Sequence, residues 1–321
     1  MKIDLIGAGA MGLLLAGKLA AAGDEVRIWC RSEAQAQQLA EQGLTVYDGD
    51  GGAARRLTGE QFRAAPAACF ADRWLAEPAD CLLITLKQHD FHRSLPQLLA
   101  PLKGSKPEIV CFQNGYGHLE TLQSLLPEAA IWAAVTTEAA KRKSFTEVIH
   151  AGKGEVYIGK SLNGNHGAGQ VSITANSLVE ALNKAGFSAF LSNEVDTMIF
   201  RKLLINAVIN PLTAIWRVPN GELPMPGYRL QLMKELYEEA SSIFDACGIS
   251  YGAHTWDDIL QVCKATADNV SSMLADVLAF RPTEVQWING SIAAMAEKRG
   301  LKAPLHRWIC QVMDGMTVKE R

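Results

Sequence analysis

Residues 2–21, KIDLIGAGAMGLLLAGKLAA, constrain the fold of this chain more than any other stretch. An apolar run ends at Ile6, glycines follow at positions 7, 9 and 12, and a helical pattern extends from Met11 to Ala22. A strand, a glycine turn and a helix in this order open the first βαβ unit of a doubly wound sheet. We therefore expect a parallel sheet whose first strand lies at the amino terminus.

Short apolar runs alternate with helical patterns through about the first 190 residues. The runs are EVRIW (25–29), CLLITL (81–86), EIVCF (108–112), IWAAV (131–135) and FSAFLS (187–192). This alternation predicts a parallel sheet covered by helices. Two β-rich runs around AGKG (151–154) predict an antiparallel hairpin appended to that sheet.

The second part of the chain has helical periodicity instead. The expected helices cover 196–216, 225–247, 255–280, 283–299 and 304–315. We therefore predict an α/β plus all-α protein: an N-terminal Rossmann-type dinucleotide-binding domain, residues 1–193, followed by an all-helical C-terminal domain, residues 194–321.

Composition excludes several classes of partner. The formal net charge is -3 over 321 residues, which favours neither a nucleic acid partner nor an anionic membrane surface. The seven cysteines are scattered without a CxxC pair, so we predict no metal site, no disulfide framework and a cytoplasmic location. Glycines interrupt the apolar amino terminus, and no apolar stretch reaches the roughly 18 residues of a membrane span.

The segment GAGAMG (7–12) matches the GxGxxG fingerprint of dinucleotide-binding proteins. Its first glycine allows a tight turn, its second lets the backbone approach a pyrophosphate, and its third permits close contact between helix and strand. The phosphates would lie at the amino terminus of the helix. The expected cofactor-binding residues of this loop are Gly7, Ala8, Gly9, Ala10, Met11 and Gly12.

The end of the second strand bears on the choice of cofactor. NAD-dependent proteins carry an acidic residue about 20 residues beyond the fingerprint, whereas a nearby arginine accommodates the 2′-phosphate of NADP. Here the strand ends at Arg31, and Glu33 is the alternative acidic residue. Ser32 and Gln35 resemble a capping box, which leaves Arg31 and the Ser32 hydroxyl facing the phosphate. We predict NADP(H).

Two polar residues follow later strands of the predicted sheet. Lys87 comes after CLLITL, and Asn114 comes after EIVCF. Because ligands bind outside the carboxyl ends of strands in open α/β folds, both are candidates for cofactor contacts, although isolated surface residues would show the same pattern. His89 and His92 have no third metal ligand nearby, and we interpret them as surface residues.

The segment RKLLINAVINPLTAIW (201–216) combines an apolar helix with a polar stripe. Lys202, Asn206 and Asn210 are four residues apart and therefore share one helix face. A stripe exposed to solvent remains an alternative, but asparagines are weak helix formers, and lysine with asparagines suits a ligand rich in oxygen atoms.

Two further segments contain polar residues on predicted helices. Asn269 and Ser272 are placed at i, i+3, and Glu284 is placed in the first turn of a helix that a capping box of Thr283 and Gln286 would begin. Complementation of the helix dipole would account for Glu284 equally well.

These motifs follow one another in a characteristic order. The segments are GAGAMG (7–12), TLKQ (85–88), QNGYG (113–117), TTEAA (136–140), RKLLINAVINPLTAIW (201–216), VPNGEL (218–223), ADNVSSML (267–274) and RPTEVQWING (281–290). Together they cover most of the chain and resemble the ketopantoate reductases (2-dehydropantoate 2-reductases). The resemblance implies NADPH-dependent reduction of 2-dehydropantoate to (R)-pantoate, a step of pantothenate and coenzyme A biosynthesis.

The resemblance also implies roles for individual residues. Lys202 would be the general acid for the C2 oxygen. The implied substrate contacts are Asn206, Asn210, Asn220, Asn269 and Ser272. The implied cofactor contacts are the loop Gly7 to Gly12, Arg31, Lys87, Asn114, the backbone near Ala140, and Glu284. Glu138 in TTEAA and Pro282 depart from the family pattern.

Two other functions fit the same motifs. One is an NADP-dependent reductase of another small 2-oxo or 3-hydroxy acid, and the other is a non-catalytic NADPH-binding regulator. The complete stripe of Lys202, Asn206 and Asn210 disfavours the regulator. The apolar C-terminal helices are compatible with a homodimer.

Overall fold

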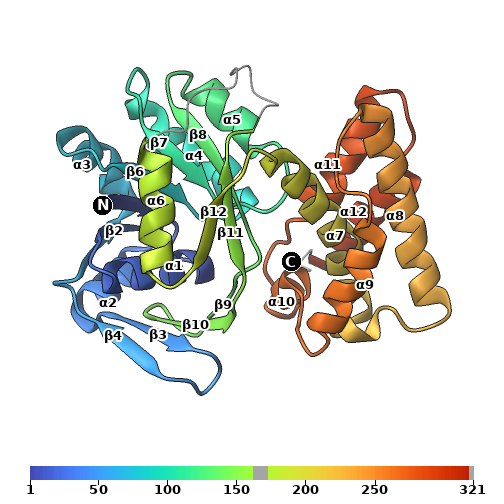
Figure 1. The fold of residues 1–321 in the computed structure, drawn as a ribbon, viewed down its shortest axis with the longest axis horizontal. Helices are drawn as coiled ribbons and strands as arrows, with labels where there is room; N and C mark the ends of the chain where they lie inside the picture. Colours follow the sequence, from blue (N-terminus) through green and yellow to red (C-terminus); the bar gives the residue numbers. More distant parts are fainter. Residues whose placement is uncertain (162–172, 318–321) are drawn as a thin grey trace. The chain divides into compact units, whose positions relative to one another are not determined.

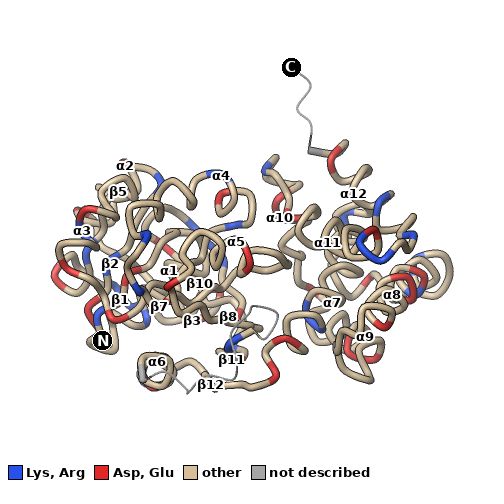
Figure 2. The backbone as a smooth tube through the Cα atoms, turned by 90° about the horizontal axis from the view of Figure 1, so that it is seen from above, with Lys and Arg blue, Asp and Glu red and all other residues tan. Residues whose placement is uncertain are grey.

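The structure is a computed structural model that describes residues 1–161 and 173–317. The chain divides into two compact units, whose helices and strands are labelled in Figure 1. The first unit comprises Met1–Gln113 and His118–Val195, and the second comprises Asn114–Gly117 and Asp196–Arg321. Lysine, arginine and acidic residues are interspersed over each unit (Figure 2).

The first unit is built on an eight-stranded sheet in the order β12-β11-β8-β7-β6-β1-β2-β5. Within it only β8 and β11 are antiparallel neighbours; all other described pairs are parallel. The strands are β1 (Lys2–Ile6), β2 (Glu25–Cys30), β5 (Phe62–Pro66), β6 (Cys81–Ile84), β7 (Glu108–Cys111), β8 (Ala130–Thr136), β11 (Glu155–Gly159) and β12 (Ser188–Leu191). This topology confirms the predicted Rossmann-type sheet, with the crossover from β5, at one edge, to β6, on the other side of β1, that defines a switch point.

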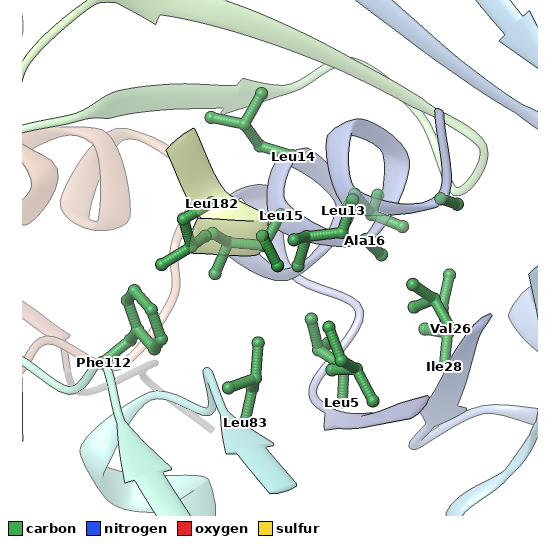
Figure 3. Close-up of a cluster of buried hydrophobic side chains, with 14 of the residues drawn as sticks. Leu5, Leu13, Leu14, Leu15, Ala16, Val26, Ile28, Leu83, Phe112 and Leu182 are labelled. Atoms are coloured by element: carbon green, nitrogen blue, oxygen red, sulfur yellow. The ribbon is translucent and has the colours of Figure 1, made fainter. Parts of the chain in front are cut away.

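Helices cover both faces of this sheet, so its strands are buried on both sides. Leu5 and Leu83 point toward α1 (Ala10–Ala21) in Figure 3, in a core that also includes Leu182 of α6 (Ile173–Lys184). Their neighbours Ile6 and Ile84 belong to a second core on the opposite face. That face is covered by α3 (Phe70–Ala76), α4 (Gln88–Leu99) and α5 (His118–Leu125). Because successive side chains of a strand point to opposite faces, this one sheet contributes residues to two hydrophobic cores.

The predicted hairpin around residues 151–154 is wrong. β10 (Glu147–Gly152) pairs with β3 (Leu44–Asp48) and β9 (Ala139–Arg142) in a separate sheet of order β4-β3-β10-β9, in which β4 is Ala54–Leu57. β11 pairs with β8 and β12 in the large sheet. Val148 is fully buried in the same core as Leu14 of α1, which points away from the large sheet in Figure 3. β10 therefore pairs with β3 because this places Val148 against the buried side of α1. The glycines at 151–154 do not by themselves determine the pairing.

A buried ion pair lies on β1 and β2, on the face of the sheet that carries Ile6 and Trp29. Arg27 donates to both oxygens of Asp4 through Nε and Nη2, each at 2.7 Å, and Trp29 Nε1 donates to Asp4 Oδ1 at 2.7 Å. The Asp4 side chain is completely buried, and the Arg27 side chain is 3% exposed. Arg27 also donates to the carbonyl of Glu77 at 2.9 Å and lies 3.5 Å from its half-exposed carboxylate, so Asp4 is the buried one of two ion-pair partners.

The second unit is helical, as predicted. Its elements are α7 (Val195–Trp216), η3 (Asn220–Glu222), α8 (Tyr228–Cys247), α9 (Thr255–Ala265), α10 (Ser272–Leu278), α11 (Val285–Lys298) and α12 (Pro304–Thr317). α7 is long and apolar enough to cross a membrane by composition, but 61% of its most apolar window is buried inside the protein. Leu204 and Val208 of α7 belong to one core with Phe244 and Ile292, so α7 is the core helix of this unit.

The single helix predicted over 255–280 is wrong, because α9 ends at Ala265 and α10 begins at Ser272. The intervening residues favour turns and caps over a helix interior. Ser271 is the N-cap of α10, and its hydroxyl accepts from the amide of Leu274. Asn269 therefore lies in a turn and not on a helix. The capping box at Thr283 is wrong too, since Glu284 is the N-cap of α11 and Gln286 donates to Asp314.

A buried polar chain joins four helices of the second unit. Pro211 lies inside α7 and has no amide hydrogen for the carbonyl of Ala207, four residues earlier. Asn289 Nδ2 donates to that carbonyl at 2.9 Å and contacts His306 Nδ1 at 3.0 Å. His306 Nε2 lies 3.2 Å from the carbonyl of Leu236. The contacts are consistent with a neutral His306 protonated at Nε2.

This arrangement predicts an acid-sensitive second unit. Burial lowers the pKa of His306 from 6.5 to about 4. Between these two pH values the histidine is protonated in the unfolded chain but neutral in the folded protein. The free energy of unfolding should therefore fall as the pH falls from about 6.5 toward about 4, by up to about 3 kcal/mol. Hydrogen exchange of α11 and α12 at pH 7 and pH 5 measures this change.

The matched variant is His306→Gln, which can accept from Asn289 but does not titrate. Its second unit should show a smaller difference between the two pH values than the wild type. An unchanged difference would assign the acid sensitivity to other groups. Burial also lowers the pKa of His118, to about 3, so exchange must be followed separately in the first unit.

Candidate functional site

The glycine turn after β1 is held in place by Thr85, the residue that directly follows β6. Gly7 has φ +114°, a conformation that side chains disfavour, and its carbonyl accepts from Thr85 Oγ1 at 2.7 Å. A Cβ at Gly12 would lie 1.9 Å from the Gly7 carbonyl oxygen and 2.6 Å from Thr85 Oγ1. These two glycines are therefore required by the protein's own packing.

Gly9 differs, because the space beside it is open. It is the N-cap of α1, and no heavy atom of the described chain comes within 4 Å of a Cβ built there. The first turn of α1 has no acidic residue, and Gly9 provides no side-chain cap. The amides at this helix end and the positive end of the helix dipole thus suit a pyrophosphate. The loop fits the cofactor predicted for it.

Gly12→Ala is expected to abolish dinucleotide binding. The added methyl overlaps the Gly7 carbonyl, so α1 must move away from the turn that carries its amides. Titration of NADPH by fluorescence measures the loss. Gly23→Ala is a control outside the loop, since a Cβ there meets nothing within 4 Å, although its φ of +94° costs some stability. Binding by Gly12→Ala at near wild-type affinity would contradict the expected packing.

The segment after β2 contains the residues predicted to select the cofactor. Arg31 is 76% exposed, and its Nη1 lies 2.8 Å from Asp90 Oδ1. Ser32 caps α2 (Glu33–Gln42) by accepting from the amide of Gln35. The Gln35 side chain does not complete the predicted capping box, because Nε2 donates to the carbonyl of Ala8 in the glycine loop at 2.9 Å.

Two more predicted cofactor residues lie in the first unit. Lys87 is the N-cap of α4, directly beyond β6, and is partly buried. Ala140 lies on β9 opposite His150 of β10. Glu138, the departure from the family pattern, is buried and hydrogen-bonds to His150 Nε2. Its carboxylate therefore has a partner inside the protein and anchors the start of the strand that carries Ala140.

A hollow of about 430 Å³ lies elsewhere in the first unit. Trp29, Ala64 and Arg73 line it, and none of its lining residues is a predicted cofactor residue. The polar groups that converge on the glycine turn identify the site better than this volume does. In the described part of the chain, no three His, Cys, Asp or Glu side chains are arranged to hold a metal ion.

In the second unit the stripe of α7 carries a titratable group with a strongly lowered pKa. Burial lowers the pKa of Lys202 from 10.5 to about 8, and the carboxylate of Glu284 opposes the shift. Glu284 is itself buried, at the N-cap of α11. The start of α11 and the stripe of α7 thus bring an interacting carboxylate and lysine together from distant parts of the sequence. A lysine whose pKa lies near the pH of the cell can donate a proton efficiently.

The amides of the predicted substrate site lie around the same helix. Asn206 is partly buried and Asn210 is buried on α7. Thr213 donates to Ser271 Oγ at 2.7 Å, which ties α7 to the start of α10. Ser272 is exposed in the first turn of α10.

Asn220 and Asn269 lie side by side. The amide of Asn220 donates to the carbonyl of Asn269 at 3.0 Å, and Asn220 Nδ2 donates to Thr266 Oγ1 at 2.8 Å. Asn220 Oδ1 is buried and has no hydrogen-bond partner among the described residues. The structure thus brings together two predicted substrate residues from separate segments.

Asn114 belongs to the second unit, whereas Lys87, also predicted to contact the cofactor, belongs to the first. The segment that contains Asn114 packs on α11 and α7. The amide of Tyr116 donates to the Trp287 carbonyl, and the centre of the Tyr116 ring lies 5.2 Å from that of Phe200. Asn114 is therefore in the same unit as Lys202 and Glu284.

Several residues that shape the site were not predicted as site residues from the sequence. Thr85 and Gln35 hold the glycine turn, and Gln113 Nε2 donates to the carbonyls of Ile84 and Leu86 at the end of β6. Each lies within four residues of a predicted cofactor residue, and each is a polar residue just after an apolar strand or near the start of a helix. That position is the only local signal they carry.

A doubly wound sheet with a glycine turn after β1, followed by a helical unit, defines a protein with a Rossmann-type domain and a separate helical domain. The model of the family described as ketopantoate reductase PanE/ApbA matches residues 3–163, and its C-terminal counterpart matches residues 194–317. This chain belongs to the ketopantoate reductase family.

Individual relatives agree with this assignment. A 2-dehydropantoate 2-reductase of Shigella flexneri is 32% identical over 95% of this chain and 91% of its own length. One from Bacillus subtilis (strain 168) is 32% identical over 94% of this chain and 93% of its own. The crystal structure of a probable 2-dehydropantoate 2-reductase from Bacillus subtilis has a TM-score of 0.78 at 28% identity, covering 98% of this chain and all of that one.

Proposed function

We propose that this protein reduces 2-dehydropantoate to (R)-pantoate with NADPH, with Lys202 as the general acid, in pantothenate and coenzyme A biosynthesis. The observation that carries the proposal is the lowered pKa of Lys202, on a stripe with Asn206 and Asn210. Membership of the ketopantoate reductase family supports the choice of substrate.

In the proposed reduction, NADPH and Lys202 have different roles. Bound NADPH supplies the hydride that reduces C2 of the oxo acid. The ammonium of Lys202 stabilises the negative charge that develops on the C2 oxygen and then donates a proton to it. With a pKa of about 8, Lys202 is mostly protonated at neutral pH and yet is a stronger acid than an exposed lysine.

The remaining predicted residues would bind and orient. Under this proposal, residues 1–193 bind the dinucleotide through the Gly7–Gly12 loop, Arg31, Lys87 and the backbone near Ala140. Residues 194–321 bind the substrate. Its oxygen atoms would be held by Asn206, Asn210, Asn220, Asn269 and Ser272. Asn114 and Glu284 would complete the cofactor contacts.

The test is NADPH oxidation by the purified protein with 2-dehydropantoate beside a panel of other 2-oxo acids. We expect the highest kcat/KM for 2-dehydropantoate. A higher value for another 2-oxo acid would support the alternative, a reductase of a different small acid. NADPH binding without turnover of any panel member would indicate a regulator instead.

The proposal extends to location and assembly. We infer a cytoplasmic enzyme, since α7 is a buried core helix and the relatives are 2-dehydropantoate 2-reductases. We also propose a homodimer, which the exposed Trp308 on α12 and Phe280 beyond α10 would favour. Sedimentation velocity across a range of protein concentrations tests the dimer.

A further inference from the structure

An ion pair spans the carboxyl end of β1. Arg31 follows β2, and Asp90 lies in the first turn of α4, which follows β6. β1 lies between these two strands in the sheet. Arg31 Nη1 is 2.8 Å from Asp90 Oδ1 and 2.9 Å from Oδ2, so one nitrogen contacts both oxygens. The pair therefore lies over the place where the chain leaves β1 for the glycine turn.

Asp90 is less exposed than its partner. Its side chain is 21% exposed, against 76% for Arg31, and His89 Nε2 lies 3.3 Å from its Oδ1. A flexible, exposed arginine can move to a new anion at little cost, whereas the carboxylate on a helix start is held in place. Arg31 thus has two possible anionic partners, a fixed carboxylate and an arriving phosphate.

We propose that Asp90 is a specificity-determining residue that weakens the preference for a 2′-phosphorylated dinucleotide. This inference rests on the proposed NADPH-dependent function. Asp90 competes with the 2′-phosphate for Arg31 and repels the phosphate, because both are anions. A dinucleotide with a free 2′-hydroxyl has no such group and is not opposed. Asp90 therefore narrows the difference in affinity between NADPH and NADH.

The experiment compares Kd values for NADPH and NADH, and for the fragments 2′,5′-ADP and 5′-AMP, by calorimetry of the full-length protein. Asp90→Asn should lower the Kd for NADPH and 2′,5′-ADP by roughly 3- to 10-fold. The Kd for NADH and 5′-AMP should change less than twofold. Arg31→Ala alone should raise the Kd for NADPH and narrow the preference over NADH.

The matched control is Glu33→Gln, which removes one negative charge from the exposed first turn of α2, close to Arg31 in sequence. It should move the NADPH affinity less than Asp90→Asn does. In an Arg31→Ala background the gain from Asp90→Asn should fall below twofold, because the competition has been removed.

Three results would overturn the inference. They are an unchanged NADPH affinity in Asp90→Asn, an equal change for NADPH and NADH, and an equal effect of Glu33→Gln. In each of them the wild type still binds NADPH, so the proposed function stands. A wild-type protein that binds neither dinucleotide would overturn both the inference and the proposed function.

Discussion

Lys202→Met is expected to reduce kcat by about 10²- to 10⁴-fold while the Kd for NADPH changes little. The substitution removes the group proposed to stabilise and protonate the C2 oxygen, and this is the usual contribution of a general acid. Single-turnover oxidation of NADPH measures the chemical step, and fluorescence titration measures cofactor affinity. A kcat within tenfold of the wild type would remove Lys202 from the proposed role.

Two controls separate chemistry from folding. Arg201→Met changes the adjacent residue of α7, which is exposed and paired with Asp258, and should leave kcat nearly unchanged. Lys202→Met itself should be at least as stable as the wild type at pH 7. The folded pKa of about 8 lies below 10.5, so burial of the ammonium destabilises the fold until the pH rises through these values.

The lowered pKa of Lys202 also predicts the direction in which kcat changes with pH. A general acid must carry its proton, so kcat should fall as the pH rises above about 8. Lys202→Arg keeps a positive charge that does not titrate in this range, and its residual activity should lack that fall. A wild-type rate that rises above pH 8 would contradict proton donation by Lys202.

Asp4→Ala is expected to lower the free energy of unfolding of the first unit by about 3–5 kcal/mol. The substitution removes the buried carboxylate partner of Arg27 and the acceptor of Trp29 Nε1, and it leaves the half-exposed Glu77 carboxylate, 3.5 Å from Arg27 Nη1, as the remaining ion-pair partner. A buried charge that loses its buried partner carries a desolvation cost that the ion pair with Asp4 had offset. Urea unfolding, followed by hydrogen exchange in β1 and β2, measures the loss in this unit.

Glu25→Ala is the matched control, since Glu25 is an exposed carboxylate on β2 and should change stability by less than 1 kcal/mol. The triple variant Asp4→Leu, Arg27→Met and Trp29→Phe removes both charges and should recover most of the stability. A loss below 1 kcal/mol in Asp4→Ala would mean that water reaches Arg27 and compensates it.

Local pattern was sufficient for much of the fold. The strand, glycine turn and helix at residues 2–21 appear as β1, the turn and α1, and the runs at 81–86 and 108–112 appear as β6 and β7. Helical periodicity also located α7, α8, α11 and α12. These elements carry long periodic patterns or glycines whose spacing admits few backbone conformations.

Predictions about pairing were less successful, because pairing depends on surfaces that are distant in sequence. The turn at 151–154 looked like a hairpin, but β10 is buried against α1 and pairs with β3. The small second sheet was not foreseen at all. The break between α9 and α10 was missed although Asn269 and Ser271 are good turn and cap residues, since the apolar periodicity continues across it.

The sequence by itself determined the glycine turn and the polar face of α7, because both follow from the geometry of a strand, a turn and a helix. Only the tertiary structure decided how each polar group is compensated. Burial lowers the pKa of Lys202 to about 8, and Glu284 from another helix opposes part of that shift. Arg31 is paired with Asp90 rather than simply solvated. The energy of a charge depends on its distance from other charges and from water, and folding sets both distances.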